Sequence, residues 1–556
     1  MAVAGEPELT LASPVVRRTA KDVLAGSLLV LSLLCRLPTL AAQARPDTSA
    51  VISRITLERR NVFDQDEQAK FWLLRLVNTL HIRTQTPVIR SEFLLRVGDH
   101  YDSVRAAETE RNLKALGVFR RVSVDSVTTD SGFTMRVVTS DGWSTRPDLR
   151  FRSTGGSVVY TLALIEDNLL GTATHTELNY RKDPDRSSTI LAFRKTRLIA
   201  GKLGASLIYT DRSDGRLLSG TVSWPFFANE SRFGAALTFD TRRERVLRFR
   251  DGLELARDTL QRRYVLGRID VARAFRASPL GYLRAGVSAQ VRRDDFTDQA
   301  TADLVGIPTH TVTGAAGGFV EMRHDHHAKV RGYQSFGVDE YVDLSGVVRL
   351  SALAAPKALG YPQDGIAPLL TAHAGLSFPG GFAFGDLSLG GLYTSAGLDS
   401  GQVLIGGTAV FLPNPRHQVI IHAEVGMLAL PVQGSEFDLG LGAGPRAFRE
   451  HAFTGDREYF GTAEYRYTLT QDFLKVTGVG LSAFADRGGA WWQGESRRSG
   501  WDAGIGLRVG PSRAPDQESS RIDLVRRFGN DREQGGWVLV VGKGFVFSTG
   551  LRGGSR

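Results

Sequence analysis

The sequence predicts a small α+β domain followed by a large antiparallel β-barrel of the transmembrane type. Three observations support this fold class. The chain opens with a short apolar run that follows basic residues, helical periodicity is confined to the part before residue 143, and short alternating segments fill most of the rest. Length alone, at 556 residues, would allow about two to four domains. The change of pattern therefore sets the predicted boundary, between residues 143 and 146.

Residues 1–44 are predicted to be a secretory signal peptide. Their apolar core, Val23–Cys35, is short for a membrane-spanning helix, and it lies between a basic stretch and the small residues "AAQA" that end at Ala44. An N-terminal anchor helix, a lipoprotein signal at Cys35 and a twin-arginine signal are alternative interpretations. Cys35 is the only cysteine, so a chain processed after Ala44 would carry no disulfide and no thiolate metal site.

The basic balance of the chain favours lipid head groups or an aqueous lumen over nucleic acid as a partner. The net charge is +10 and the isoelectric point is about 9.7, but no basic block is interleaved with aromatic residues. The mean hydropathy of −0.13 agrees with a barrel, because lumen-facing polar residues would dilute the lipid-facing apolar ones.

Residues 50–143 are predicted to form one mixed α/β domain. Apolar spacing predicts a strand and two helices, and alternation then predicts a hairpin with its turn at "TTDSG". Asp102 or Ser103 can cap the second helix and Gly117 can end it. The predicted elements are strand Val51–Arg60, helix Asp64–His81, helix Tyr101–Phe119, strand Phe119–Val127 and strand Gly132–Ser140.

Three stretches of this domain carry a resemblance to a known family. They are "NTLHIRTQTPVIRSEFLLRVGDHYD" (78–102), "ERNLKALGVFRRVSV" (110–124) and "TSDGW" (139–143). In that order they resemble a POTRA domain, the periplasmic module of the BamA/TamA family. The resemblance implies a periplasmic domain that pairs an exposed sheet edge with client strands. A domain that serves only as a periplasmic spacer is the alternative.

Residues 146–547 are predicted to form an outer-membrane β-barrel, with residues 548–556 as a C-terminal tail. A soluble sandwich, a propeller and a membrane barrel can all use such alternating strands. Export, segments about ten residues long and charged faces such as that of "LGRIDVARAF" (266–275) favour the barrel. Allowing about 25 residues per strand and loop, the segment holds about sixteen strands, an even number as bacterial barrels have. A direct count of alternating segments is nearer twenty.

Two further stretches resemble parts of the same family's barrels. Asn168, Leu169, Leu170 and Gly171 form an "NLLG" turn like the one near the start of those barrels, and Asn and Gly both permit a tight periplasmic turn. The second stretch is "GWVLVVGKGFVFSTGLRGGSR", in which alternation leads to Lys543, Gly544 and Phe545. It resembles a closing strand that ends on an aromatic residue, although 11 residues follow Phe545 here.

The glycine-rich stretch "GPRAFREHAFTGDREYFGTAEYR" (444–466) resembles the loop of this family that folds back into the barrel. Its Arg-Gly-Phe tip corresponds to Arg446, Ala447 and Phe448, with alanine in place of glycine. The resemblance implies that Arg446 meets Glu464 and Asp486 on the inner wall of the following strands. A guanidinium can satisfy two carboxylates at once, which a lysine cannot copy. The expected role is structural and gating, not catalytic.

A second stretch competes for the role of the loop tip. "VRGYQSFG" (330–337) spells the motif around Arg331 more faithfully, but it lacks the downstream acidic and aromatic frame, and more chain follows it than the family expects. Arg446 is favoured because about five strand-like runs follow it, and Arg331 stays open as the alternative.

Motifs for chemistry are weak throughout the chain. "HDHH" (324–327) could bind a metal only if neighbouring histidines converged, and "GLGAG" (440–444) precedes no helix that would make it a nucleotide loop. No G-x-S-x-G, P-loop or HExxH motif occurs. No enzyme activity, cofactor or metal site is therefore expected.

The resemblance implies insertion of proteins into the outer membrane, or their translocation across it. The implied partners are membrane lipid and lipopolysaccharide, unfolded β-barrel or secreted clients, and periplasmic chaperones or lipoproteins. A passive channel or surface antigen is the alternative, and a barrel enzyme is a third reading without a visible nucleophile.

Overall fold

The computed structural model describes most of the chain between residues 50 and 547. Not described within that span are residues 65, 67–71, 130–131, 155–156, 199–202, 251, 256–259, 297–309, 432–433, 441–442, 514–517 and 529–534. The predicted signal peptide, at 1–44, and the predicted tail, at 548–556, lie outside the described residues.

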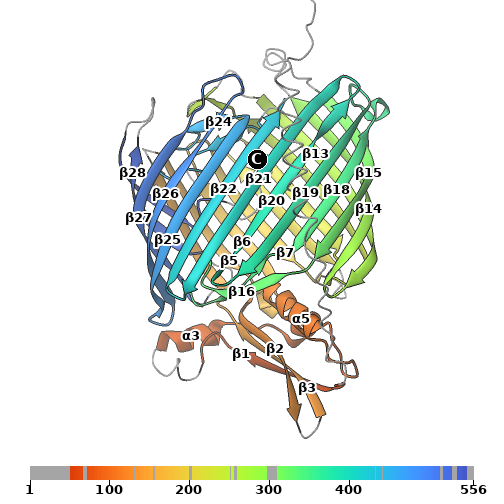
Figure 1. Cartoon of the computed structure of the whole chain (residues 1–556), viewed down its shortest axis with the longest axis vertical. Helices are drawn as coiled ribbons and strands as arrows, with labels where there is room; N and C mark the ends of the chain where they lie inside the picture. Colours follow the sequence, from red (N-terminus) through yellow and green to blue (C-terminus); the bar gives the residue numbers. More distant parts are fainter. Residues whose placement is uncertain are drawn as a thin grey trace, which may run out of the picture. The chain divides into compact units, whose positions relative to one another are not determined.

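The N-terminal α/β region (residues 50–143) contains a three-stranded sheet with α4 and α5 packed on it, and α3 lies to one side of the sheet (Figure 1). The strand order is β1-β3-β2, and the central strand β3 is parallel to β1 and antiparallel to β2. The elements are β1 (Ile52–Arg60), α3 (Trp72–Leu80), α4 (Thr86–Arg90), α5 (Ser103–Ala115), β2 (Phe119–Thr129) and β3 (Gly132–Asp141).

Local sequence signals account for these elements. Asp102 caps α5 by accepting hydrogen bonds from the backbone N–H groups of Val104 and Arg105, at 2.8 and 3.2 Å. Leu113 of α5 and Met135 of β3 are both fully buried in the core of the region. The short helix α4, which begins beside Pro87, was not predicted separately from the sequence.

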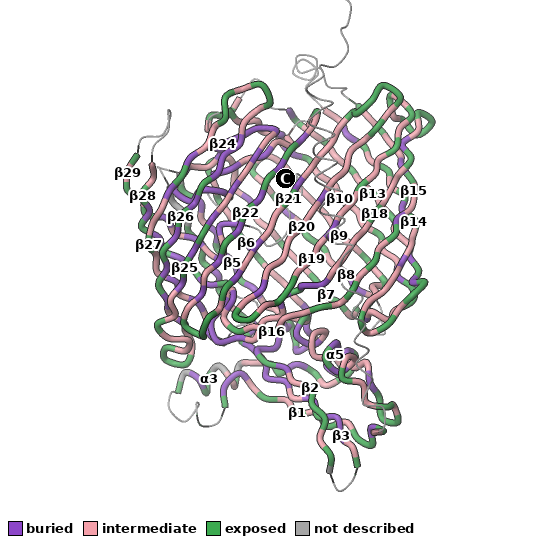
Figure 2. The backbone as a smooth tube through the Cα atoms, viewed as in Figure 1, coloured by how far each residue is buried: buried purple, intermediate pink, exposed green. Residues whose placement is uncertain are grey.

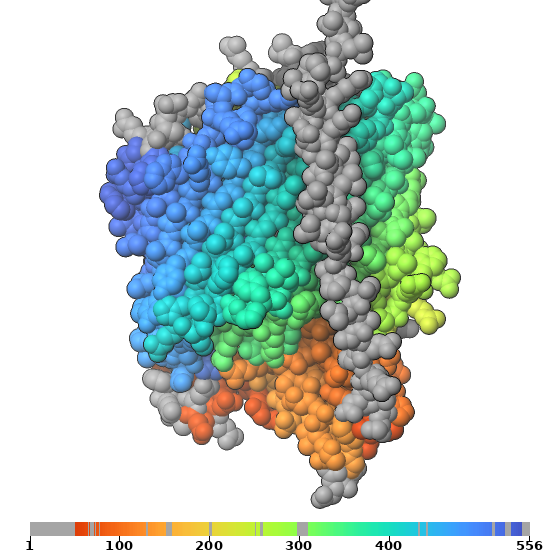
Figure 3. Space-filling view, viewed as in Figure 1, coloured from red at the N-terminus to blue at the C-terminus, as the bar shows by residue number. Residues whose placement is uncertain are grey.

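A closed antiparallel barrel of twenty strands follows. Its strands are β4 (Thr145–Thr154), β5 (Ser157–Glu166), β6 (Thr174–Lys182), β7 (Ser187–Lys195), β8 (Gly204–Arg212), β9 (Gly215–Trp224), β10 (Phe233–Val246), β13 (Leu260–Ser278), β14 (Gly281–Phe296), β15 (His310–His324), β18 (Gly346–Ala355), β19 (Gly365–Phe378), β20 (Gly381–Thr394), β21 (Gly397–Asn414), β22 (His417–Ala429), β25 (Arg457–Phe473), β26 (Thr477–Trp491), β27 (Gly500–Pro511), β28 (Ser520–Phe528) and β29 (Gly536–Lys543). Figure 3 shows the packed outer wall that the later strands form, coloured cyan to blue.

The prediction of about sixteen strands is wrong, because the turns are shorter than it allowed. Only Pro279 and Leu280 separate β13 from β14, and only Ser395 and Ala396 separate β20 from β21. Twenty strands between Thr145 and Lys543 leave about 20 residues for each strand and its turn, where about 25 had been assumed.

Alternation along each strand separates an exposed outer face from a buried inner face (Figure 2). In β26, Leu481 is exposed on the outside, whereas Ser482, Phe484 and Asp486 are buried on the inside. Charged inner positions are paired along one strand, as for Arg268 and Asp270 on β13, 2.9 Å apart. Among the described residues, no helix is long and apolar enough to cross a bilayer.

In the described part of the chain, three short strand pairs and two 3₁₀ turns lie outside the barrel wall. They are β11 (Phe249–Arg250) with β12 (Leu253–Glu254), β16 (His327–Arg331) with β17 (Asp339–Asp343), β23 (Phe437–Leu439) with β24 (Phe453–Gly455), η1 (Leu169–Gly171) and η3 (Lys357–Leu359). The lumen loop is residues 430–456, which include β23 and β24, and the mouth hairpin is residues 325–345, which include β16 and β17.

One end of the barrel contacts the N-terminal α/β region and is called the near end. Arg105 of α5 donates two hydrogen bonds to Glu230 of the β9–β10 turn, at 2.9 and 3.0 Å. Arg197 of the β7–β8 turn donates to Glu92 at 2.7 Å. These ion pairs join the region to turns at the ends of the strands.

The barrel closes at a seam between β29 and β4. The nineteen other junctions carry residue-by-residue ladders in the described residues. At the seam, Lys543 of β29 lies 3.2 Å from Asp148 of β4. The strands beside it are short: β29 has 8 residues and β28 has 9, whereas β13, on the far side of the sheet, has 19.

Candidate functional site

The lumen loop crosses the inside of the barrel. It leaves the wall after β22 and returns at β25, and between these strands β23 pairs with β24. Thr454 of the loop donates to the backbone oxygen of Phe249, which follows β10, at 2.9 Å. The loop therefore reaches a part of the barrel that lies about 200 residues away in the sequence.

Arg446 lies at the tip of the loop among three carboxylates. Its Nε and Nη2 donate to the two carboxylate oxygens of Asp486, at 2.6 and 3.2 Å. Nη2 also donates to Glu464 at 3.3 Å, and Nη1 donates to Asp523 at 3.1 Å. The guanidinium lies over the ring of Phe484, 3.5 Å from its centroid. The structure thus brings together Arg446, Glu464 and Asp486, the residues named from the sequence.

The electrostatics of the cluster explain why so many charges can be buried. Burial lowers the pKa of Arg446, but the carboxylates of Asp486, Glu464 and Asp523 outweigh that effect and hold the pKa above its ordinary value. Four arginines and four acids share this part of the inner wall, all less than a tenth exposed: Arg446, Arg466, Arg508, Arg521, Glu464, Asp486, Asp502 and Asp523.

Sequence reasoning missed Asp523 and Arg508, which complete the cluster. Arg508 of β27 donates to Glu464 at 2.9 and 3.0 Å and also contacts Asp523 of β28. Both lie at inward positions of alternating strands. The alternation could have identified them as lumenal, but not as neighbours of Arg446, because the strand count and stagger were unknown.

Alanine in place of glycine at the loop tip is accommodated without strain. Ala447 is fully buried, its φ is not positive, and its N–H donates to Asp502 at 3.0 Å. Phe448 is also fully buried and lies against Gly500 of β27, where an added Cβ would come within 2.1 Å of the ring. The aromatic tip therefore requires glycine on the wall rather than in the loop.

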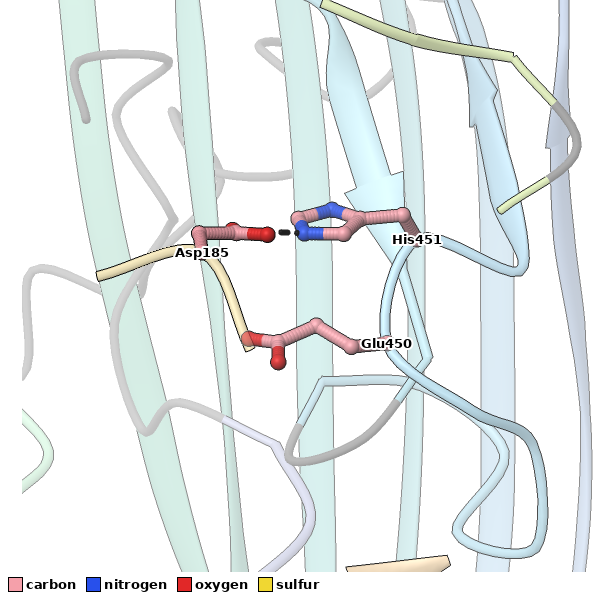
Figure 4. Close-up of side chains that lie close together, drawn as sticks. All are labelled: Asp185, Glu450 and His451. Atoms are coloured by element: carbon pink, nitrogen blue, oxygen red, sulfur yellow. Dashed lines mark hydrogen bonds and ion pairs between the residues drawn. The ribbon is translucent and has the colours of Figure 1, made fainter. Parts of the chain in front are cut away.

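A second contact of the loop centres on His451, as Figure 4 shows. Its Nδ1 lies 2.5 Å from Asp438 of β23, and its Nε2 lies 2.9 Å from Asp185 in the β6–β7 turn. Burial lowers the pKa of His451, whereas these hydrogen bonds raise it, with a net value of about 9. The ring also stacks on Phe249, with centroids 3.5 Å apart.

His451 also belongs to a group that could in principle hold a metal ion. In the described part of the chain this group is Asp185, Glu450 and His451. Because both ring nitrogens of His451 donate to carboxylates, neither has a lone pair free for a metal. The arrangement fits an ion pair better than a metal centre. The "HDHH" stretch forms no such group: His327 lies on β16, 3.3 Å from Asp325.

Arg331, the alternative tip residue, lies in the mouth hairpin. It donates to the backbone oxygen of Gly337 in the same hairpin, at 3.1 Å. The pocket of carboxylates surrounds Arg446 instead.

The "NLLG" turn docks into the N-terminal α/β region. The Asn168 amide donates to the oxygen of Ile82 at 3.2 Å and to the hydroxyl of Thr84 at 3.0 Å. The backbone N–H of Gln85 donates to the oxygen of Gly171 at 2.8 Å. Leu169 and Leu170 remain 40% and 65% exposed, so the polar ends of the turn provide the attachment.

The predicted alternation through Phe545 is wrong, because β29 ends at Lys543. Gly544 has a φ of +67°, and a Cβ there would lie 2.2 Å from Glu518. This left-handed residue turns the chain into the barrel. Phe547 then stacks on His422 of β22, with ring centroids 4.0 Å apart.

Comparisons with known proteins give structural matches only. No protein-family model and no curated protein sequence matches the chain. Similar solved structures include BamA from Haemophilus ducreyi lacking POTRA domains 1–3, with a TM-score of 0.39, 10% identity, and coverage of 88% of this chain and 85% of that one. CdiB from Acinetobacter baumannii matches with a TM-score of 0.44, 10% identity, and coverage of 89% and 74%. The FrpB iron transporter from Neisseria meningitidis matches with a TM-score of 0.38 and 9% sequence identity, and the match covers 77% of this chain and 87% of that one.

Proposed function

We propose that this protein inserts polypeptides into a bacterial outer membrane, or translocates them across it. In this proposal the barrel spans the membrane and the N-terminal α/β region is a POTRA-like domain in the periplasm. The observation that carries the proposal is the seam between β29 and β4, where β29 is the shortest of the described barrel strands and Lys543 forms an ion pair with Asp148 across the junction.

The outer surface of the barrel supports a place in lipid. Apolar side chains point outward along the strands, as do Ile505 at 62% and Leu539 at 58% exposure. Large aromatic side chains such as Phe275 and Trp537 are also exposed near strand ends. An apolar band with aromatic residues near its edges is what a bilayer requires of a barrel.

The short strand β29 affects both the barrel and the lipid beside it. Eight residues of β29, at a rise of about 3.4 Å and a tilt of about 40°, reach about 20 Å across the membrane. The hydrocarbon core of a bilayer is about 30 Å thick, so lipid beside the seam would have to thin. A thin bilayer and short strands both lower the cost of carrying polar backbone into the membrane.

The Arg446 cluster would hold the lumen loop against the wall next to this seam. Asp523 lies on β28, the immediate neighbour of β29. Removing one partner from a buried charge cluster costs about 3–5 kcal/mol. The cluster is therefore proposed as a lock that fixes the loop and stiffens the strands beside the seam.

The contents of the lumen argue against a passive channel. The lumen loop enters it from one end, and the mouth hairpin and residues 544–547 occupy it at the near end. An insertase needs the lumen closed while its wall opens at the side.

The N-terminal sheet offers an edge for a client strand. In the order β1-β3-β2, the described residues place β1 at an edge, with most of its side chains exposed. An extended client segment can add to such an edge through main-chain hydrogen bonds. Unfolded barrel or secreted proteins are the proposed clients, with periplasmic chaperones or lipoproteins as further partners.

Depletion followed by comparison of the outer-membrane proteome tests the proposal. Loss of insertase or translocation activity should reduce other barrels or secreted proteins and leave unassembled clients in the periplasm. Complementation with the intact chain is the control for indirect effects. An unchanged proteome together with a loss of small-solute conductance would favour the channel instead.

A further inference from the structure

The mouth hairpin connects two parts of the molecule that are far apart in the sequence. At one end it contacts α5 of the N-terminal α/β region, and at the other it contacts residues 544–547, which follow β29. Neither the resemblance nor the Arg446 cluster accounts for this bridge.

Two ion pairs and one further hydrogen bond attach the hairpin to α5. Arg111 of α5 lies 2.6 Å from Asp325, whose side chain is 8% exposed. Lys329 donates to Glu110 of α5 at 2.7 Å, and the hydroxyl of Tyr341 donates to the same Glu110 oxygen. The Glu110 side chain is 14% exposed, so loss of these donors would leave a poorly solvated charge.

The tip of the hairpin fits onto two neighbouring barrel strands. Phe336 is 8% exposed and lies against Gly478 of β26 and Gly510 of β27, which are paired in register. A Cβ at Gly478 would come within 2.0 Å of the phenyl ring, and one at Gly510 within 3.2 Å. Both strands therefore carry glycine where the ring lies, so the tip and the wall are matched in shape.

The tip is joined in turn to the end of β29. The N–H of Ser519 donates to the oxygen of Gln334 at the tip, at 3.2 Å. The N–H of Gly544, the first residue after β29, donates to the oxygen of the same Ser519 at 2.9 Å. The ring of Tyr333 also contacts that of Phe545, with centroids 5.4 Å apart.

We propose that the mouth hairpin is a latch that couples the N-terminal α/β region to the seam. This inference rests on the proposed function and adds a control to it. With α5 in place, the hairpin holds residues 544–547 inside the lumen and so holds the end of β29. Displacing α5, as client docking on the region would do, takes the Arg111 donor away from Asp325 and takes the Glu110 acceptor away from Lys329 and Tyr341. Phe336 at the tip then moves away from Gly478 and Gly510, and the end of β29 loses its contacts with the hairpin.

Hydrogen–deuterium exchange of the full chain in liposomes tests the latch without any client. The variants are Glu110→Gln, which weakens the α5 end, and Phe336→Ala, which weakens the tip. Phe319→Ala is a matched control, because Phe319 of β15 is also buried against a wall glycine, Gly286 of β14, and its cation–π partner is Arg349 of β18 rather than α5 or residues 544–547. The amides of β29 and, as a reference, those of β13 are followed.

Each latch variant should raise exchange in β29 at least about tenfold and leave β13 unchanged. The double variant should add little to the larger single effect, because both changes open one device. Unchanged exchange in β29 with Glu110→Gln, an additive double variant, or an equal rise in β29 with Phe319→Ala would each overturn the latch. Because exchange is measured without clients, a failed latch is distinguishable from a failed insertase.

Discussion

Arg446 forms ion pairs with three carboxylates from three different strands. The side chain at this position must therefore direct several N–H donors in different directions. We expect Arg446→Lys to destabilise the lumen loop nearly as much as Arg446→Ala, because an ammonium cannot reach Asp486, Glu464 and Asp523 together. The alanine variant should cost about 3–5 kcal/mol. Loss of heat-modifiable gel mobility and increased leak current in planar bilayers are the measurements.

Arg216→Ala is the matched control for that experiment, because the Arg216 side chain is 75% exposed and pairs with Asp211, which is itself 55% exposed. It should leave both measurements near those of the unmodified protein. Normal conductance and gel mobility of Arg446→Lys would show that a positive charge alone holds the loop and that the planar guanidinium is not required.

His451 gives the lumen loop a dependence on pH. Its pKa is raised from 6.5 to about 9 by Asp185 and Asp438, and Glu450 also faces it. A raised pKa stabilises the fold fully below pH 6.5, and that stability is lost as pH rises through about 9. A shift of this size corresponds to about 3 kcal/mol. Limited proteolysis of the loop between pH 6 and pH 10 should accelerate near the upper value, about 9.

His451→Gln should remove this dependence, since glutamine keeps a hydrogen bond but does not titrate in the range. Cleavage that accelerates at the same pH in both proteins would place the titrating group elsewhere.

At the scale of elements, the η1 turn attaches the barrel to the N-terminal α/β region through the Asn168 side chain and through hydrogen bonds from Gln85 to the backbone of the turn. Asn168 donates to Ile82 and Thr84 and accepts from the N–H of Ala173. Asn168→Ala should cost about 1–3 kcal/mol, because these groups lose buried partners. Faster amide exchange at residues 82–85, with the barrel strands unchanged, is the expected result. Leu170→Ala, at a residue of the same turn that is 65% exposed, should have little effect.

The sequence predicted elements well wherever the evidence was local. Alternation identified the strands, and the resemblance of residues 444–466 to the family's loop implied Glu464 and Asp486 as partners of Arg446. Asp523, Arg508 and the pairing of His451 with Asp185 depend on which distant strands face one another. Alternation cannot supply that, because it fixes the face of a residue but neither the number of strands nor their stagger.

The two errors have physical causes of the same kind. Turns as short as Pro279–Leu280 raised the strand number to twenty, because hairpins need far fewer residues than an average loop. Phe545 does not continue the predicted strand, because Gly544 adopts a left-handed conformation. Glycine permits this conformation, but a glycine in a sequence does not by itself predict it.

At the scale of the whole molecule, the proposal requires the barrel wall to open at one place. Cysteines at Asp148 and Lys543, in a Cys35→Ser background, would allow the seam to be bridged by a bifunctional maleimide, since these side chains lie 3.2 Å apart. Bridging should stop client assembly, because β29 could no longer leave β4. The same bridge between Val271 and Val287, registered partners on β13 and β14, should leave assembly intact. Normal assembly by the bridged seam would mean that clients do not enter the membrane there.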